Sequence, residues 1–307
     1  MKAVCFIILN FRQADLVISN VTFLRKLFPE ATFVLVDNNS RDGSYEKLAS
    51  SLADESKIKV ISSRSNSGYA IGNNLGVKEA ISSFDPEFIA IMNPDVVIAE
   101  SKTISAIIEA FRADNDLSIC TGLMLDSSRM LNPRSIAWKT LDKLDDCLLN
   151  LPYFSSRISL EKYRAFRIHE NGLIYVDVVP GSFFVARTDY FKKMGMFDEN
   201  TFLYCEERIL GIKAKRLRLK VALVPSVYFV HDHPKEKKSF ASTMKSYFHL
   251  ISSRFYYNKT YNSWPKWIVL PPFIVSAGLG YLLTALSWVV KRTVNCFKRI
   301  LKKGKSQ

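Results

Sequence analysis

Residues 32–40, Thr-Phe-Val-Leu-Val-Asp-Asn-Asn-Ser, decide the fold that the sequence predicts. Thr32–Val36 is rich in β-branched and aromatic residues, which is typical of a buried strand. It ends directly in the polar turn Asp37–Ser40, and a helical pattern follows at Gly43–Leu52. Strand, polar turn and helix succeed one another in this order along the first third of the chain.

Repetition of this unit predicts an α/β protein. The other expected strands are Ala3–Leu9, Lys57–Ile61 and Phe88–Met92, and the other expected helices are Asp15–Phe28, Tyr69–Ser82 and Ser101–Phe111. Strands alternating with helices indicate a mostly parallel sheet covered on both faces. Residues 126–172 are polar and irregular. After them we expect strands at Ile174–Val178 and Val221–Val224, and helices at Glu206–Leu217 and Lys238–Tyr257.

Polar residues follow the four front strands. They are Asn10, Asp37 to Ser40, Arg64 with Asn66, and Asn93 to Asp95. Ligands of open parallel sheets bind beyond the carboxyl ends of the strands. The pattern therefore predicts a nucleotide-binding cleft at this edge.

Charge is distributed unevenly along the 307 residues. The net charge is +14, and the segment from Arg208 to the end contributes 20 Lys and Arg against 2 Asp and Glu, so the remainder is slightly acidic. A basic rear favours an anionic partner, for which charge alone leaves both nucleic acid and anionic lipid open. The five cysteines form no CxxC pair, which favours reduced cytosolic thiols over a zinc site or a disulfide framework. The short run Ala3–Leu9 does not predict a signal peptide.

Six short motifs, in order across residues 3–232, resemble the family 2 glycosyltransferases, which have a GT-A fold. They are Val36 to Ser40; Asn66 to Ala70 with Asn73, Asn74 and Gly76; Asn93-Pro94-Asp95; Gly195 to Glu199; Tyr204 to Glu207; and Pro225 to His231. The Asn-Pro-Asp motif resembles the variant of the metal-binding Asp-x-Asp motif that is common in the rhamnosyltransferase-like branch. The resemblance implies a GT-A nucleotide-diphospho-sugar transferase fold with a Rossmann-like, mostly parallel sheet.

The chain departs from the family pattern in three places. Asn93 stands where many relatives have Asp, so one carboxylate must serve the metal. Ile209 replaces an Asp that usually follows the catalytic acid, which removes one acceptor-side contact. The Gln-x-x-Arg-Trp mark of processive synthases is absent from the sequence, which favours transfer of a single sugar.

The resemblance implies a set of residues for the nucleotide-sugar donor. These are Asn10, Asp37, Asn39, Arg64, Asn66, Gly68, Asn73 and Asn93. The Asp37 carboxylate would accept hydrogen bonds from the base or ribose. Alternatively, the Asp-Asn-Asn-Ser turn stabilises itself. Asn66 and Gly68 open a helix whose N-terminus favours anions, although simple helix capping explains them too.

Asp95 and His231 are the expected ligands of a divalent metal, Mn²⁺ or Mg²⁺. A carboxylate-bound cation can neutralise the charge of a leaving diphosphate. The alternatives are a helix-entry turn at Asp95 and a structural role for His231.

Glu206 and Glu207 are the expected catalytic acids, and alignment with the family places the base at Glu207. Inversion needs one carboxylate to take a proton from the acceptor hydroxyl. Gly181 and Asp198 are expected on the acceptor side. The alternative is that both Glu residues only favour the dipole of their helix N-terminus.

These features predict an inverting transferase that moves one sugar, from dTDP-rhamnose or a UDP-hexose, to a lipid-linked glycan of the cell surface. A Rossmann-type oxidoreductase would need a Gly-x-Gly-x-x-Gly after the first strand, which Asn10–Gln13 does not supply. A non-catalytic membrane-associated protein would leave the polar strand ends unexplained. A nucleic-acid partner is not expected, because the basic residues flank an apolar run rather than a groove-reading motif.

We expect a transferase domain at residues 1–232 and a basic, apolar, membrane-associating region at 233–307. Residues 268–290 are uncharged and reach about 34 Å as a helix, enough to span a bilayer. A span would put the basic tail outside, against the positive-inside rule. We therefore expect a re-entrant or interfacial helix on an anionic membrane surface, at the cytoplasmic face of the inner (plasma) membrane. A true span and a helix packed on the soluble domain are the alternatives. Bends are expected at Pro271-Pro272 and Gly278–Gly280, with Trp264, Trp267 and Trp288 at headgroup level.

Overall fold

The computed structural model describes residues 4–52, 56–131, 137–149, 167–232 and 239–303. The chain divides into two compact units. The first contains Met1–Leu141 and Ser159–Pro234, and the second contains Asp142–Ile158 and Lys235–Gln307. The sequence placed one boundary after residue 232 and did not anticipate that residues 142–158 go with the C-terminal unit.

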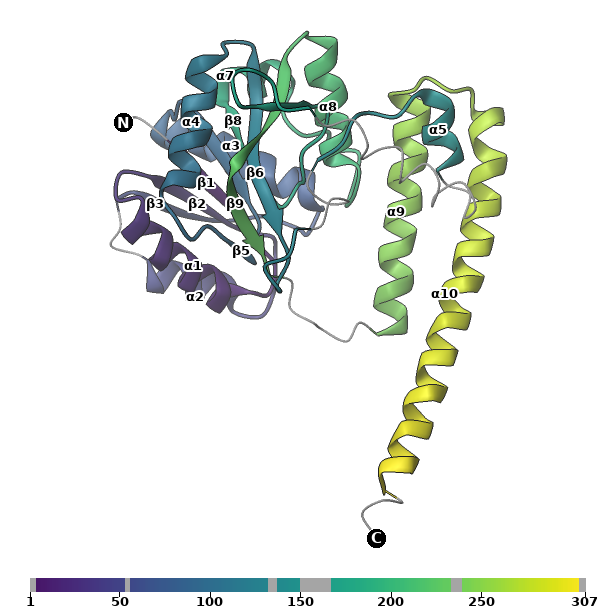
Figure 1. Ribbon diagram of the computed structural model, residues 1–307. Coiled ribbons are helices and arrows are strands. Elements are labelled where there is room, and N and C mark those ends of the chain that lie inside the picture. The colour runs from purple at the N-terminus through teal and green to yellow at the C-terminus, as the bar shows by residue number, and fades with distance from the viewer. Residues whose placement is uncertain (1–3, 53–55, 132–136, 150–166, 233–238, 304–307) are drawn as a thin grey trace. The chain divides into compact units, whose positions relative to one another are not determined.

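The first unit begins with four parallel strands. They are β1 (Val4–Asn10), β2 (Thr32–Asp37), β3 (Ile58–Ser62) and β4 (Phe88–Met92), in the spatial order β3-β2-β1-β4 (Figure 1). The register aligns Asn10 with Asp37, and Asp37 with Ser62. Parallel strands in register have their carboxyl ends at the same edge of the sheet. The polar residues that follow β1 to β4 therefore lie at one edge, as predicted.

Helices connect these strands at the predicted places. They are α1 (Ala14–Leu27), α2 (Ser44–Ser51), α3 (Tyr69–Phe84) and α4 (Lys102–Ala113). Two buried apolar clusters occupy the two faces of the sheet, with Phe6 and Ile8 in one and Ile7 in the other. Alternate residues of a strand point to opposite faces, so a strand with both faces covered must be apolar throughout.

The rest of the sheet is mixed. Strand β8 (Phe183–Arg187) is antiparallel to β4 and to β6 (Leu117–Leu125), and β9 (Lys220–His231) is parallel to β6. The short strands β5 (Val96–Val97) and β7 (Ile174–Val176) pair antiparallel with β9. Strands β6 and β8 were not among the predicted elements. Ser118, Thr121 and Gly122 interrupt the apolar run of β6, and β8 is a short apolar run that could equally belong to a buried helix.

Strand β9 is much longer than the predicted Val221–Val224, and it bulges in the middle. Its register against β6 jumps from Gly122 opposite Val224 to Leu123 opposite Tyr228, so that Pro225 to Val227 are extra residues. Proline lacks the N–H that a ladder needs. A Cβ on Gly122 would lie 2.9 Å from the Val227 carbonyl oxygen, so the bulge requires glycine there. Beyond the bulge, β9 delivers His231 to the sheet edge opposite Val96.

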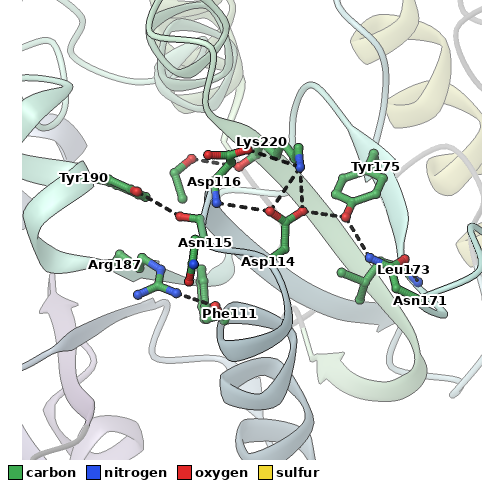
Figure 2. A network of polar contacts seen from close by, with 11 residues as sticks. Phe111, Asp114, Asn115, Asp116, Asn171, Leu173, Tyr175, Arg187, Tyr190 and Lys220 are labelled. Carbon is green, nitrogen blue, oxygen red and sulfur yellow. Dashed lines mark hydrogen bonds and ion pairs between the residues drawn. The ribbon is translucent and has the colours of Figure 1, made fainter.

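Helix α4 and the starts of β6 and β9 are joined by a polar network (Figure 2). The Asp114 carboxylate accepts from the Tyr175 hydroxyl at 2.6 Å and from Lys220 Nζ at 3.0 Å. Partial burial would raise the pKa of Asp114, but hydrogen bonds from Tyr175 and Lys220 outweigh this and lower it. Nearby, the Tyr190 hydroxyl donates to the Asn115 carbonyl at 2.8 Å. This network lies at the amino ends of β6 and β9.

The second unit is helical. It contains α5 (Lys143–Leu148), α9 (Phe240–Thr260) and α10 (Lys266–Lys303). Helix α5 belongs here because polar contacts hold it: Asn262 Nδ2 donates to Asp146 Oδ2 at 3.3 Å, and Trp264 Nε1 donates to the Lys143 carbonyl at 3.0 Å. The contacting residues are distant in sequence, so no local sequence pattern predicts these contacts.

Helix α10 exceeds the expected helix 268–290. It continues without interruption through Pro271-Pro272 and Gly278–Gly280, where bends were expected. Its segment Lys266–Val294 is long and apolar enough to cross a membrane, and only 11% of its apolar window is buried.

Candidate active site

Asp37, at the end of β2, is the centre of a buried polar cluster. Its Oδ1 accepts from Asn10 Nδ2 at 2.8 Å and from the Ser40 hydroxyl at 2.5 Å, and its Oδ2 accepts from the Ser40 N–H at 3.0 Å. The side chain is only 2% exposed. A carboxylate has about four acceptor positions, so these three bonds leave one on Oδ2. The geometry is that of the self-stabilised turn, and a contact to nucleotide stays a prediction.

Gly68 opens α3 with φ of +101°, a conformation that strongly favours glycine. A Cβ there would lie 2.3 Å from the Phe202 carbonyl oxygen, and the Tyr69 N–H donates to that same oxygen at 2.9 Å. Asn66 Oδ1 accepts from the Gly68 N–H and from Asn38 Nδ2, at 3.3 and 3.1 Å. Because Gly68 has no side chain, it packs directly against the backbone of Phe202. Phe202 precedes α8 (Glu206–Arg216), the helix that carries the two acids.

The other expected donor-side residues lie around this turn. Asn39 has φ of +55° and donates to the Arg64 carbonyl at 3.2 Å, which links the ends of β2 and β3. The Arg64 side chain is exposed. Asn73 is buried and donates to the Tyr69 carbonyl at 2.9 Å within α3.

Asp95 and His231 are brought together by the pairing of β5 with β9. Asp95 Oδ1 lies 3.2 Å from His231 Nε2, and the Asp232 N–H donates to the Asp95 carbonyl at 2.9 Å. Asn93 precedes this pair, and its N–H donates to the Ser182 carbonyl at 2.8 Å. The metal motif thus adjoins the segment that leads into β8.

This pair fits part of a divalent-metal site. Neighbouring ligands of an octahedral ion with bonds of about 2.1 Å stand about 3.0 Å apart, close to the observed separation. Within the described residues, no group of three or more His, Cys, Asp and Glu is arranged for a metal. Asp95 and His231 would supply two ligands of such an ion, and diphosphate oxygens of a donor are of the hard type that Mg²⁺ and Mn²⁺ prefer.

Glu206 and Glu207 begin α8, after two residues with left-handed backbone, Tyr204 at φ +77° and Cys205 at φ +71°. Positive φ is uncommon for residues other than glycine, and two in succession fix the direction from which the chain enters α8. Glu206 is only 3% exposed, whereas Glu207 is half-buried. The position of a Cβ on Gly181 would be 3.9 Å from Glu207 Oε2, so the Glu207 carboxylate faces that segment.

The two acids differ in burial, and burial shifts the pKa of Glu206. Burial raises the pKa of Glu206 from its ordinary value of 4.5 to about 8, and the charge of Glu207 adds to this effect. Glu206 is therefore largely a neutral acid at pH 7. Glu207 is the more accessible of the two carboxylates.

Tyr69 links the two sides of the site, a role that the sequence did not suggest. Its hydroxyl donates to the Gly181 carbonyl at 2.6 Å, and its ring packs edge-on against Phe197 at 5.6 Å. Desolvation raises the pKa of this hydroxyl, and the charges of Glu206 and Glu207 add to the effect. From the sequence, a tyrosine in the first turn of a helix is interpreted as a core residue. Only the hydrogen bond to the Gly181 carbonyl shows that Tyr69 connects two parts of the site.

Asp198 lies on the loop between α7 (Thr188–Lys193) and α8. Its Oδ1 accepts from the N–H and the side-chain amide of Asn200, at 2.9 and 2.8 Å. Asn74 of α3 holds the same loop through the Phe197 carbonyl and Glu199 Oε1. Asp198 therefore shapes the loop before the acids, and an acceptor contact stays a prediction.

A mixed sheet with polar strand ends, a carboxylate–imidazole pair and an acid-bearing helix is the architecture of a GT-A glycosyltransferase. Two solved structures support this class. One is GalNAc-T7 with UDP, GalNAc and Mn²⁺ (TM-score 0.58, 14% identity, 83% of this chain and 49% of that one). The other is the mannosyltransferase PcManGT from Pyrobaculum calidifontis with GDP-Man and Mn²⁺ (TM-score 0.56, 14% identity, 95% and 79%).

The chain belongs to glycosyl transferase family 2, whose model matches residues 5–195. It is 25% identical over 217 residues to the low-salt glycan biosynthesis hexosyltransferase Agl10 of Haloferax volcanii, covering 71% of this chain and 64% of that protein. It is also 25% identical over 180 residues to the rhamnosyltransferase WbbL of Escherichia coli K12, covering 57% and 64%. The chain thus spans about 64% of the length of each of these relatives.

These findings confirm the expected family 2 glycosyltransferase with a GT-A fold, and the curated relatives include a rhamnosyltransferase, in line with the expected branch. They give no support to an oxidoreductase or to a non-catalytic binding protein.

Proposed function

We propose that this glycosyltransferase inverts the anomeric centre as it transfers one sugar from a nucleotide sugar to a lipid-linked glycan acceptor. The observation that carries this proposal is the convergence on the segment Gly181-Ser182. The Glu207 carboxylate faces Gly181, and the backbone of Asn93, at the start of the metal motif, is bonded to Ser182. A donor held at the metal motif would therefore be within reach of the base.

Glu207 is the general base in this mechanism. It takes the proton of the acceptor hydroxyl as the oxygen attacks the anomeric carbon and the nucleoside diphosphate leaves. Retention through a covalent intermediate would require a nucleophile in addition to the acid–base group. Glu206 is a poor candidate for that nucleophile, because it is buried and largely neutral at pH 7.

Asp95 and His231 would hold a divalent cation, Mn²⁺ or Mg²⁺, on the donor diphosphate. When bound, such an ion neutralises charge on the leaving group. On the nucleoside side, Asn10, Asp37, Asn39, Arg64 and Asn66 frame the ends of β1 to β3, and the remaining acceptor position of Asp37 suits a ribose or base donor.

The donor that we propose is dTDP-rhamnose or a UDP-hexose. The curated relatives are a hexosyltransferase of glycan biosynthesis and a rhamnosyltransferase, which supports a sugar of this kind and an acceptor in cell-surface glycan assembly. The apolar helix α10 and the basic C-terminal residues support action at a membrane. Because nucleotide sugars are cytosolic, we place the enzyme at the cytoplasmic face of the inner (plasma) membrane.

The test is a donor screen with the purified protein and Mn²⁺. dTDP-rhamnose and a set of UDP- and GDP-hexoses are offered with a polyprenyl-diphosphate-linked sugar, and released nucleotide and extended lipid are both measured. We expect one donor to give product with inverted anomeric configuration, and none with Glu207→Gln. A product of retained configuration would overturn the mechanism. Failure of every donor to bind would overturn the donor assignment.

A further inference from the structure

Helices α9 and α10 form an antiparallel hairpin in a single register (Figure 1). Aromatic pairs join them at three levels: Phe240 with Trp288 at 5.3 Å, Tyr247 with Tyr281 at 5.2 Å, and Phe255 with Phe273 at 5.2 Å between ring centroids. Equal steps along the two helices separate these pairs. The Tyr247 hydroxyl also donates to the Ser276 carbonyl at 2.8 Å. Helix α9 therefore accompanies most of the apolar stretch of α10.

The two helices differ in chemistry at the same level. By this register Lys245 of α9 lies level with Leu283, and Arg254 lies level with Ile274. Both levels fall inside the apolar segment Lys266–Val294. If α10 crossed a bilayer with α9 attached, both cations would enter the hydrocarbon. Charged side chains there are strongly disfavoured and usually line a water-filled path or pair with one another.

The side of α10 that faces away from α9 is apolar and exposed. Val269, Phe273 and Ser276 are buried. At 100° per residue the opposite side carries Trp267, 76% exposed, and Leu282, 61% exposed, and the exposed Ile274 and Leu286 flank that side. Exposed apolar surface of this length on one helix marks an interaction site.

We propose that the hairpin lies flat on an anionic bilayer, with the outer side of α10 among the lipid headgroups and upper acyl chains and α9 above it toward water. This inference rests on the membrane association proposed above and adds its geometry. The bilayer is favoured as occupant over a second copy of the chain because the sequence from Lys291 carries Lys and Arg without Asp or Glu. Such a tail is attracted to anionic lipid and repelled by its own copy.

Depth-dependent quenching in vesicles tests this geometry. The full chain, with Cys296 replaced by Ser, receives one cysteine at Leu282 or at Lys245 and a fluorescent label. Cys5, Cys120, Cys147 and Cys205 are buried, and the variant without an added cysteine measures any labelling of them. The vesicles are phosphatidylcholine with or without phosphatidylglycerol, carrying quenchers at shallow or deep acyl positions.

We expect the label at 282 to be quenched most by shallow lipid quenchers, and the label at 245 by aqueous iodide. Strongest quenching of both labels by the deep quencher would overturn the flat geometry in favour of a span. Mutual self-quenching at 282 without any lipid quenching would overturn it in favour of a dimer.

Matched charge variants separate this inference from the enzymatic one. Leu282→Glu with Leu286→Glu should lower partition into anionic vesicles by about tenfold or more, because apolar burial is lost. Ser252→Glu, exposed on α9, should change it by less than about threefold, because only charge is altered. Equal loss in both variants would contradict the assignment of α10 as the lipid face. Hydrolysis of the nucleotide-sugar donor in detergent measures the enzymatic activity without a membrane. Absence of this hydrolysis in the wild-type protein would contradict the proposed function and not the membrane geometry.

Discussion

Asp95 Oδ1 stands 3.2 Å from His231 Nε2, although one residue follows β4 and the other ends the last strand of the sheet. The antiparallel pairing of β5 with β9 creates this contact. The proposed metal site would therefore depend on strand pairing rather than on a local motif alone.

Loss of Asp95 should abolish metal-dependent nucleotide binding. Asp95→Ala removes the charged ligand, whereas His231→Ala should weaken binding less, because oxygen ligands suit Mn²⁺ and Mg²⁺ better than imidazole does. Calorimetry of UDP and dTDP with Mn²⁺ or EDTA measures this. Asp232→Asn, next along the chain and exposed, is the control that should bind normally. Equal transfer with EDTA and with Mn²⁺ would rule out the metal.

Glu207→Gln should lower turnover by roughly a hundredfold or more while donor affinity stays near wild type, because general base catalysis contributes at least that much. Glu206→Gln should be milder, since that acid is already largely neutral at pH 7. Single-turnover transfer and donor binding are measured separately. Glu207→Gln turnover above about a tenth of wild type would disprove the assignment.

Glu206 should make folding stability depend on pH. Its pKa is 4.5 ordinarily and about 8 in the folded chain, so the folded state holds a proton that the unfolded state releases. This contribution is complete below pH 4.5, falls as pH rises toward 8 and is lost above it. Thermal melts across this window should show the decline in wild type and a flatter profile in Glu206→Gln. An unchanged profile in the variant would contradict the raised pKa.

Gly68→Ala should destabilise the fold more than Gly172→Ala. Both glycines have positive φ. Gly68, at φ +101° and ψ −176°, lies in a region that essentially only glycine adopts, where strain costs about 1 to 3 kcal/mol, and only there would the new Cβ also meet the Phe202 backbone. We expect Gly68→Ala to lower the free energy of unfolding, measured with denaturant, by more than about 3 kcal/mol, because overpacking adds to the backbone strain. Similar losses at the two positions would show that the Phe202 contact is unimportant.

Tyr69→Phe should lower kcat several-fold and leave donor affinity unchanged. The change removes the hydroxyl bond to the Gly181 carbonyl, which holds the segment that the Glu207 carboxylate faces. Tyr190→Phe is a matched control, because it also removes one tyrosine-to-carbonyl bond, in the network of Figure 2. Its kcat should not change. A parallel loss in both variants would indicate a general effect on stability, which costs about 1 kcal/mol per hydrogen bond.

The parallel half of the sheet was predictable because its signals are local. Each of β1 to β4 is a short apolar run bounded by polar residues, and each predicted strand matches within two residues. Strand β6 was missed because Ser118, Thr121 and Gly122 interrupt its apolar run. Strand β8 was missed because it lies outside the strand–helix repeat, where a short apolar run does not distinguish a strand from a buried helix. The grouping of α5 with the C-terminal helices was not predicted, because Asp146 meets Asn262 only in the folded chain.

The sequence by itself determined the family, the residues at the strand ends and the two acids on one helix, since residue type and order along the chain carry that information. Only the tertiary structure decided that Asp37 is held by its own turn, that Asp95 meets His231 and that Glu206 is neutral beside Glu207. It also decided that Lys245 lies level with the apolar centre of α10. These properties depend on burial and on contacts between distant segments, which exist only after the chain has folded.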